Sequence, residues 1–573
     1  MLISCRKIKK SFGSTVVLNS IDLDILNGDR IGIVGRNGSG KTTLANIITG
    51  CLEYDDGSII TARRQINISY LRQSQSDPHL LINTINSKEE NRELRRLSSH
   101  LGIRKIHEWS DERLNHLSGG EKTKLALARV WASHPDLAIL DEPTNHMDFE
   151  GLHSLISQLS AFQGAAVIIS HDRYFLDHTV TKIAEIEDSS IRIYNGNYSS
   201  YREAKQKERE SQQHIYESQQ KEQRKVQAAI RQLKTWSDEA HRESRQKAQG
   251  IMGGKEYFRK KAKKRDQAVK SQIKRLERMH QEQIERPKAD LQVSFDINVR
   301  EKGSSRLLEA EGISKAYGKM TLFNESSFYI KRGEKIGIIG PNGCGKTTLV
   351  KMILGKENLD AGKLHLSQTA RTAFVCQELP QGEKETFKDL VRDREMSEQK
   401  RIFQLMINLG IPYDRFNTTL GELSRGERMK IAIGLAVMGE NDLLILDEPT
   451  NHLDLFSREA LEESLMQLSG TLLVISHDRY LLQQVCDSLL VFEQQKITRL
   501  EGKIDDFFTK KVVAKTQLEN SATEELLLET KISRVLSDIS RYKPEDKEYA
   551  ALDQEYMDLI QQRKRLRMNL PLE

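Results

Sequence analysis

Short apolar runs that stop at glycine or polar residues recur along the chain. Residues 29–34 run into a glycine-rich loop, after which the apolar pattern resumes with helical spacing over 42–48. Residues 137–140 stop at two acids, and 165–169 stop before Ser-His. Aliphatic runs of this length are typical of strands buried in a parallel sheet. The pattern therefore predicts α/β domains, and these apolar runs fall far short of the ~20 residues of a membrane span.

The same succession of motifs occurs twice at one spacing. Four pairs of segments lie 305 or 306 positions apart: the glycine-rich loop at 35–42 and 340–347, Leu-Ser-Gly/Arg-Gly-Glu at 117–121 and 423–427, Asp-Glu-Pro-Thr-Asn-His at 141–146 and 447–452, and Ser-His-Asp-Arg at 170–173 and 476–479. One offset shared by four motifs indicates a duplicated module. We expect one α/β P-loop domain over residues 1–201 and a second over 306–507.

The segment between the modules, residues 202–305, has a different pattern. It is rich in charge and glutamine, and apolar residues recur every three or four positions: Val226, Ile230, Leu233 and Trp236/Ser237, then Val269, Ile273, Leu276 and Met279/His280. This spacing predicts two antiparallel helices with a narrow apolar seam. Glycines at 250, 253 and 254 place the apex of this hairpin at about 240–258.

A polar segment over 508–573 follows the second module. Its apolar spacing predicts a helical C-terminal extension with a break near Pro544. A packing or solubility appendage and an RNA contact are equally good interpretations of this segment.

Composition changes this picture through the distribution of charge. Residues 202–290 hold 25 Lys and Arg against 14 Asp and Glu, an excess of 11 positive charges, whereas the whole chain carries +6. The predicted hairpin therefore indicates contact with a polyanion, although a solvated helical surface explains the charge equally well. Five scattered cysteines with no Cys-x-x-Cys spacing argue against disulfides and a zinc site. With no signal-peptide pattern, we expect a soluble cytoplasmic protein.

The glycine-rich segment is a Walker A phosphate loop in each module, because it lies between a predicted strand and a predicted helix. Backbone N–H groups and the helix N-terminus bind phosphate, the lysine reaches the β/γ-phosphates, and the threonine hydroxyl binds Mg²⁺. An aromatic residue before glycine, Phe12 or Tyr317, is expected to stack on adenine, unless it belongs to the core. The remaining ATP-binding residues expected are Gly35, Asn37, Gly38, Gly40, Lys41, Thr42 and Thr43, and Gly340, Asn342, Gly343, Gly345, Lys346, Thr347 and Thr348.

Two neighbouring acids end the second apolar run of each module. Ligands of parallel sheets lie beyond the carboxyl ends of the strands, so these acids face the nucleotide. The first acid, Asp141 or Asp447, is expected to hold Mg²⁺. The second, Glu142 or Glu448, is expected to act as general base on the attacking water. An isolated acid pair would be an ordinary strand-end turn, but the Walker A loop upstream favours catalysis.

Two further pairs of polar residues follow predicted strands. His171 and His477 come after the third apolar run, where each is expected to sense the γ-phosphate as a catalytic residue. Gln73 and Gln377 are placed to reach Mg²⁺ and the attacking water. Outside this context each of the four would be an ordinary structural residue.

With these motifs in the same order twice, the chain resembles ATP-binding cassette (ABC) proteins along nearly all of both modules. In that family two cassettes meet head to tail, and each ATP lies between the Walker A loop of one and the Leu-Ser-Gly-Gly-Glu signature of the other. The resemblance implies a monomer with an intramolecular cassette dimer. Arg425 departs from the usual glycine of the signature, so the two sites need not be equivalent. The implied signature residues are Ser424 and Gly426 for site one, and Ser118, Gly119 and Gly120 for site two.

Three features narrow this resemblance: both cassettes lie in one chain, both contain Pro-Thr-Asn-His-(Met/Leu)-Asp, and there is no membrane domain. In these features the chain resembles the F subfamily of ABC proteins, whose members bind ribosomes. Their linker enters the ribosomal E site and touches P-site tRNA. Only 45 and 47 positions separate the glutamine from the signature serine. This short stretch and the long linker resemble the antibiotic-resistance branch, the Vga, Lsa, Msr and Vml type. In that branch the apex approaches the peptidyl-transferase centre of 23S rRNA in the bacterial 70S ribosome.

The resemblance therefore implies an ATPase, dependent on ATP and Mg²⁺, that protects ribosomes from antibiotics. Three alternatives stay open: a housekeeping translation factor at the E site, the ATPase subunit of a separately encoded transporter, and a DNA-maintenance ATPase. The transporter alternative gives no role to the basic hairpin. DNA-maintenance ATPases typically contain zinc modules or very long coiled coils, and this sequence shows neither. The residues expected to contact RNA are Arg245, Lys247, Ile251, Met252, Lys255, Arg259, Lys260, Lys261, Lys263 and Lys264.

Overall fold

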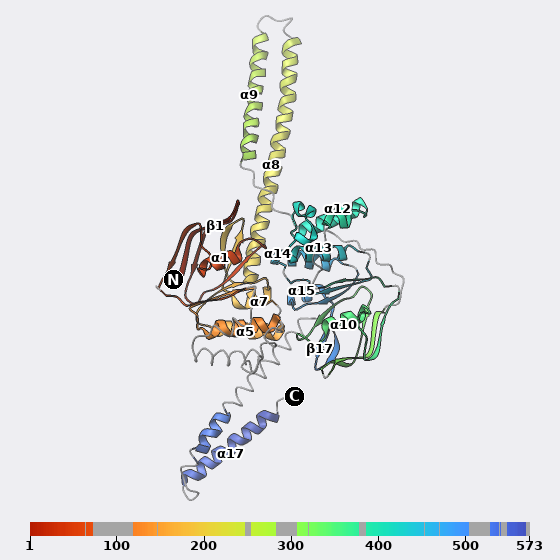
Figure 1. Cartoon of the computed structure of the whole chain (residues 1–573). Coiled ribbons are helices and arrows are strands. Elements are labelled where there is room, and N and C mark those ends of the chain that lie inside the picture. The colour runs from red at the N-terminus through yellow and green to blue at the C-terminus, as the bar shows by residue number, and fades with distance from the viewer. Residues whose placement is uncertain are drawn as a thin grey trace. The chain divides into compact units, whose positions relative to one another are not determined.

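The computed structural model of the chain is shown in Figure 1. It describes residues 1–63, 65–72, 119–145, 147–246, 254–281, 306–318, 320–368, 370–376, 385–439, 441–451, 453–468, 470–502, 528–537, 539 and 547–568. Two compact units are present. The first is Met1–Asp296, Glu378–Met438 and Thr450–Gln467, and the second is Ile297–Gln377, Gly439–Pro449 and Leu468–Glu573.

The first cassette is built on a six-stranded sheet. Its strand order is β5 (Ile68–Leu71), β6 (Leu137–Asp141), β7 (Ala165–Ile169), β3 (Arg30–Gly35), β8 (Lys182–Glu187) and β9 (Ser190–Asn195). All neighbours are parallel except β8 and β9. Every residue of β6 and β7 is buried, as expected of central parallel strands covered on both faces. A smaller antiparallel sheet has the order β2 (Thr15–Ile25), β1 (Ile3–Phe12) and β4 (Asp56–Thr61).

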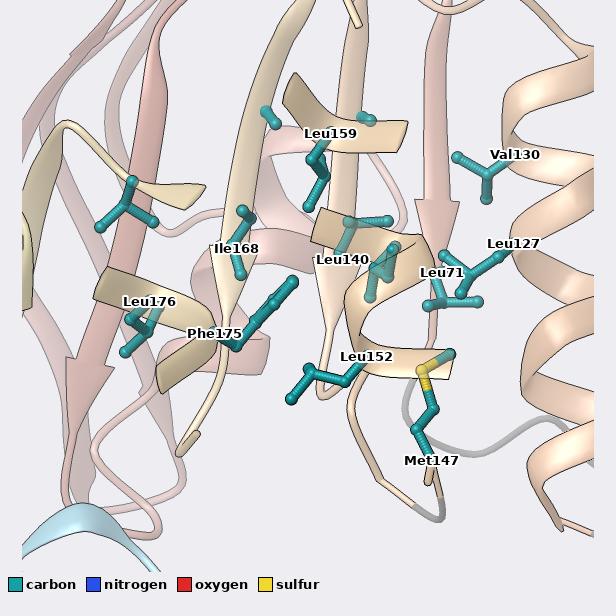
Figure 2. Close-up of a cluster of buried hydrophobic side chains, with 14 of the residues drawn as sticks. Leu71, Leu127, Val130, Leu140, Met147, Leu152, Leu159, Ile168, Phe175 and Leu176 are labelled. Atoms are coloured by element: carbon teal, nitrogen blue, oxygen red, sulfur yellow. The ribbon is translucent and has the colours of Figure 1, made fainter. Parts of the chain in front are cut away.

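Four described helices accompany this sheet: α1 (Lys41–Ile48), α5 (Gly119–Ala132), α6 (Phe149–Ala161) and α7 (Arg173–Thr179). Figure 2 shows one of the cores, in which Phe175 of α7 and Leu152 of α6 lie among the aliphatic side chains of the strands. Helices α6 and α7 begin directly after the acidic and histidine motifs. Asp148 and Asp172 cap them by accepting hydrogen bonds from backbone N–H groups in their first turns. The caps fix where each motif ends and each helix begins.

The second cassette repeats this architecture, which confirms the predicted duplication of an α/β P-loop module. Its main sheet has the order β14 (Thr372–Val375), β15 (Leu443–Asp447), β16 (Thr471–Ile475), β12 (Lys335–Ile339), β17 (Ser488–Glu493) and β18 (Lys496–Glu501). Its antiparallel sheet has the order β11 (Met320–Lys331), β10 (Arg306–Tyr317) and β13 (Ala361–Leu366). Its phosphate-loop helix is α10 (Lys346–Ile353), and α15 (Arg479–Val485) follows the histidine motif.

The helical part of the second cassette belongs to the first unit. It contains α11 (Phe387–Val391), α12 (Met396–Asn408), the 3₁₀ helices η3 (Tyr413–Asn417) and η4 (Leu420–Glu422), α13 (Arg425–Val437) and α14 (Leu455–Met466). Leu455, the first residue of α14, is buried in the same core as the residues of Figure 2. Helix α14 therefore packs directly against the first cassette.

The predicted hairpin is present as α8 (Tyr198–Gln246) and α9 (Gly254–Gln281), which run side by side (Figure 1). The 49 residues of α8 correspond to a length of about 70 Å. Val226, Ile230 and Val269 are buried in the seam as predicted, whereas Trp236 is 46% exposed. Arg275 of α9 forms an ion pair with Glu222 of α8 at 2.7 Å. Both helices extend into the range predicted for the apex.

The described residues of the C-terminal extension are helical, as predicted. Helix α17 (Lys547–Met568) packs on a helical segment over 528–537 through a small core of Ile532, Val535 and Leu559. Within the described ranges, no helix is both long and apolar enough to cross a membrane.

Candidate functional site

The phosphate loop of the first cassette lies between β3 and α1 and surrounds its own lysine. Lys41 Nζ donates hydrogen bonds to the carbonyl oxygens of Gly35 and Arg36, both at 2.9 Å. Gly40 has φ 98°, and a Cβ there would lie 2.8 Å from the side chains that flank the loop. Only glycine fits this position. Burial lowers the pKa of Lys41, so an incoming anion would relieve the desolvation of its charge.

The second phosphate loop has the same geometry. Lys346 Nζ donates to the carbonyl oxygens of Gly340 at 2.8 Å and Pro341 at 3.0 Å. It also lies 3.4 Å from Nε2 of His477. Gly345 has φ 104° and precedes α10, as Gly40 precedes α1. In each loop the lysine and the helix N-terminus therefore lie close together, which is the arrangement that binds phosphate.

The first acid of each pair is hydrogen-bonded to the loop threonine. Thr42 Oγ1 donates to Asp141 Oδ2 at 2.8 Å, and Thr347 Oγ1 donates to Asp447 Oδ2 at 3.1 Å. Tyr70 OH, a contact that sequence reasoning missed, lies 3.4 Å from Asp141 Oδ2. Burial raises the pKa of both aspartates. A hydroxyl beside a buried carboxylate is an oxygen pair suited to Mg²⁺, whose charge would offset this desolvation.

The second acid of each pair has left-handed backbone geometry. Glu142 has φ 51° and Glu448 has φ 50°, in both cases directly after the last residue of a central strand. Their backbone N–H groups donate to the carbonyls of Ile169 and Ile475 at 2.8 and 2.9 Å. The turn thus stays attached to the next strand while a non-glycine residue adopts a strained conformation. Non-glycine residues held in this conformation are often found at functional sites.

The side chains of these glutamates face the histidines. Glu142 Oε1 lies 3.5 Å from His171 Nε2, and Glu448 Oε1 lies 3.7 Å from His477 Nε2. Among the described residues, neither Oε1 atom accepts a hydrogen bond, although both are buried. Burial raises the pKa of Glu142 to about 7 and that of Glu448 to about 8, and it lowers the pKa of His171 well below its usual value. A carboxylate with a raised pKa is a stronger proton acceptor, which suits the general-base role predicted for both glutamates.

Residues of the second cassette complete the surroundings of the first phosphate loop. Asp454 caps α14 by accepting a hydrogen bond from Ser457 N at 2.8 Å, and its other oxygen accepts one from Asn37 N at 3.0 Å. Burial opposes the charge of Asp454, but Lys430 and these hydrogen bonds outweigh it and lower its pKa to about 2. Sequence reasoning did not assign Asp454 to the site, although it ends the repeated Pro-Thr-Asn-His-Leu-Asp motif. Sequence reasoning also did not assign Arg458 to the site, although its charge lowers the pKa of Glu142.

A cavity of about 260 Å³ opens beside this phosphate loop. It is lined by residues 15–17 of β2, the loop residues 36–39, residues 185–189 and Phe456. The Arg36 guanidinium lies 5.6 Å from the centre of the Phe456 ring. Loop, β2 and α14 thus enclose one space beside the phosphate position, large enough for part of a nucleotide.

The other predicted residues vary in how the structure places them. Phe12 and Tyr317 end β1 and β10 with half-exposed rings, each with a lysine ammonium within 6 Å of the ring centre, at 5.7 and 5.2 Å. Ser424 caps α13, where its hydroxyl accepts from Glu427 N, and Gly426 is in the first turn. Lys263 and Lys264 are exposed on α9. Gln73, Ser118, Gln377, Lys247, Ile251 and Met252 lie outside the described residues, as do the side chains of Arg245, Lys255, Arg259, Lys260, Lys261 and Arg425.

Comparison with known proteins agrees with this geometry. A family described as ABC transporter matches residues 18–145 and 323–451, and a second family of the same description matches residues 184–252. The chain is 38% identical to "Ribosome protection protein VmlR" of Bacillus subtilis over 96% of this chain and 95% of that protein. It is 30% identical to "Putative ATP-binding protein YdiF" of the same organism, over 92% and 85%. The solved structure of "RNase-L Inhibitor" has the same fold with a TM-score of 0.60 at 20% identity, covering 89% of this chain and 92% of that one.

Proposed function

The chain belongs to the F family of ABC proteins and is an ATPase, and from this premise we propose that it binds the bacterial ribosome and protects it from antibiotics. ATP closes the two cassettes, and closure sets the pose of the hairpin between them. The similarity to the ribosome protection protein VmlR of Bacillus subtilis supports ribosome protection. The observation that carries the ATP switch is the hydrogen bond from Asn37 N to Asp454, because it links the phosphate loop of one cassette to a helix of the other.

Hydrolysis follows from the buried residues at each site. The loop lysine, Lys41 or Lys346, holds the β/γ-phosphates and leaves its carbonyl partners when they arrive. The glutamate, Glu142 or Glu448, takes a proton from the attacking water. Burial lowers the pKa of His171, so this histidine is neutral and can orient the water or γ-phosphate through a hydrogen bond, and His477 lies in the equivalent place beside Glu448. The strained backbone aims each glutamate at that position before ATP arrives.

Mg²⁺ completes both sites in this proposal. Thr42 and Asp141 would hold it in the first cassette, and Thr347 and Asp447 in the second. Bound Mg²⁺ supplies the charge that neutralises the phosphate oxygens during transfer. The predicted roles of Gln73 and Gln377 at the metal stay part of the proposal.

The hairpin is the proposed ribosome-contacting element. It is long, basic and exposed at Lys263 and Lys264, and an elongated basic probe suits the phosphate backbones of folded RNA. We assign residues 202–305 to this linker, between cassettes 1–201 and 306–507, with the extension 508–573 beyond them. In the proposal its apex lies near the peptidyl-transferase centre of 23S rRNA and touches P-site tRNA, so the protein acts in the cytoplasm.

The switch is tested with a variant that binds ATP but does not hydrolyse it. Glu142→Gln with Glu448→Gln removes both general bases and keeps the shape of both sites. With ATP this variant should sediment with 70S ribosomes, and with ADP it should not. A matched control adds Lys41→Ala and Lys346→Ala to remove phosphate binding, and this control should not sediment in either case. Sedimentation independent of nucleotide, or none at all, would refute the switch.

Protection is tested by expression in a susceptible bacterium and growth against a panel of large-subunit antibiotics. The parent chain should raise inhibitory concentrations for at least one drug class, and the chain with both general bases replaced should not. Ribosome binding without protection against any drug would instead favour a housekeeping translation factor. Recovery in membranes, dependent on a partner, would favour a transporter subunit.

A further inference from the structure

Helix α14 of the second cassette contacts three separate parts of the first cassette through acids. Asp454, at its N-terminus, accepts from Asn37 N of the phosphate loop at 3.0 Å. Glu462 forms a buried ion pair with Arg173, two residues after His171. Glu459, which lies between them, reaches the first turn of α8, where the hairpin begins. One helix therefore connects nucleotide site one to the base of the hairpin.

The carboxylate of Glu459 bridges two residues of α8. Tyr198 OH donates to Glu459 Oε1 at 3.0 Å, and the Arg202 guanidinium pairs with Glu459 Oε2 at 3.0 Å. Tyr198 is 4% exposed and the Glu459 side chain 16%, so water competes little for the hydroxyl contact. Tyr198 and Arg202 are four positions apart, which places them on one face of α8.

The adjacent face of the same turn is attached to the first cassette. Tyr201 OH donates to Glu185 Oε1 at 2.7 Å, and Lys205 Nζ pairs with Glu185 at 2.7 Å and Glu187 at 2.8 Å. Tyr201 and Lys205 are again four positions apart. The base of the hairpin thus has one set of bonds to strand β8 of the first cassette and another to helix α14 of the second.

The two sets respond differently when site one opens. Strands β8 and β9 and the start of α8 follow one another in one cassette, so the Glu185 contacts persist. Glu459 lies five positions from Asp454, a rise of about 8 Å on one helix. Whatever moves Asp454 away from the phosphate loop also moves Glu459 away from α8.

We propose that Glu459 is the positioning residue through which closure of nucleotide site one sets the pose of the hairpin. This inference rests on the proposed ATP switch and names the contact that transmits it. The transmission is one-sided, because the offset of 306 that relates the cassettes puts His153 at the position of Glu459 and Ile156 at that of Glu462. Helix α6 of the first cassette therefore lacks both acids. ATP at site one, rather than at site two, controls the hairpin.

The test is amide hydrogen exchange of the full chain, measured by mass spectrometry with and without ATP. All variants carry Glu142→Gln and Glu448→Gln so that ATP stays bound. ATP should slow exchange in the phosphate loop, and should slow exchange in the first turns of α8 about tenfold, the size expected for gaining a hydrogen bond to a charged group.

Tyr198→Phe removes the hydroxyl that contacts Glu459, and Tyr201→Phe, the matched control, removes the hydroxyl that contacts Glu185 of the first cassette. Tyr198→Phe leaves the ion pair between Arg202 and Glu459 in place, so it should reduce the response of α8 to ATP and leave that of the phosphate loop. Tyr201→Phe should raise exchange in α8 equally with and without ATP and keep the response. Glu459→Ala removes both contacts and should abolish the response of α8, and effects in the same direction in the two variants guard against a folding defect of either one.

The outcomes separate the inference from the proposal beneath it. If ATP protects neither the phosphate loop nor α8 in the parent, the ATP switch itself is wrong. If ATP protects the phosphate loop but leaves α8 of the parent unchanged, the inference about Glu459 is overturned while the switch stands. An α8 response that keeps its full size in Glu459→Ala overturns it as well.

Discussion

Removing the charge of Asp454 should weaken the contact between the second cassette and the first phosphate loop. Asp454 is 5% exposed and its pKa is lowered from 3.8 to about 2. A depression of nearly two units corresponds to roughly 2–3 kcal/mol of stabilisation of the ionised form. Asp454→Asn keeps the shape and loses this charge, leaving the buried ammonium of Lys430 without it. We expect the first unfolding transition in urea to lose about 2–3 kcal/mol at pH 7.

The pH dependence gives this prediction its sign. Because the folded pKa of Asp454 lies below its usual value, its contribution is fully present above about pH 4 and is lost as pH falls toward about 2. The difference in unfolding free energy between parent and Asp454→Asn should therefore be constant from pH 7 to about 4 and shrink at pH 3. Unfolding is followed by circular dichroism in a urea series at each pH.

A second substitution separates the charge from the helix cap. Asp454→Ser can still cap α14 by accepting from Ser457 N, but it cannot reach Asn37, whereas Asp454→Ala also loses the cap, at a further cost of about 1 kcal/mol. Both should bind ATP more weakly than the parent in a titration with a fluorescent ATP analogue. Equal stability and equal ATP affinity in the parent, Asn and Ser forms would refute the assigned contact.

Three other predictions concern catalysis and the hairpin. Burial raises the pKa of Glu142 to about 7 and that of Glu448 to about 8, and only the ionised base takes a proton. In Glu448→Gln, which retains Glu142, kcat/KM should therefore rise with pH through about 7, and in Glu142→Gln, which retains Glu448, it should rise through about 8. Identical profiles would contradict the assignment. Lys263→Gln with Lys264→Gln should weaken ribosome binding, and the slope of log affinity against log salt, measured by sedimentation, should fall by about one for each lysine–phosphate pair that the substitutions remove. Ile230→Ala in the hairpin seam should raise exchange of α8 amides and cost about 2–5 kcal/mol locally; unchanged exchange would show that the seam is not a packed core.

Much of both nucleotide sites could be predicted because their residues are close in sequence to a strand end. Lys41 follows β3, and Asp141 ends β6, so the order of apolar run and motif is enough to place them at one edge of the sheet. The hairpin seam was also predictable from local sequence, because helical periodicity is visible within a short window of residues.

The missing parts depend on contacts over long sequence distances. Asp454 and Asn37 are 417 positions apart, and no local pattern shows that they meet. The left-handed backbone of Glu142 was also not predictable. Glycine is the usual residue with this backbone conformation, and only the surrounding sheet holds a glutamate in it. The position of Trp236 outside the seam reflects packing between two helices rather than periodicity in one.

The two sites share the residues predicted to be catalytic but differ in what surrounds them, and Arg458 is where this difference reaches the predicted general base. It is 7% exposed on α14, its Nε donates to the carbonyl of Leu453 at 3.1 Å, and after burial its charge is the largest influence on the pKa of Glu142, which it lowers. At the offset of 306, the first cassette has Leu152 instead. Arg458→Leu should therefore raise the pKa of Glu142 and shift the kcat/KM profile of Glu448→Gln to higher pH. The profile of Glu142→Gln, which reports site two, should stay in place. Equal shifts in both backgrounds would mean that Arg458 acts on the fold of the whole chain rather than on the base of site one.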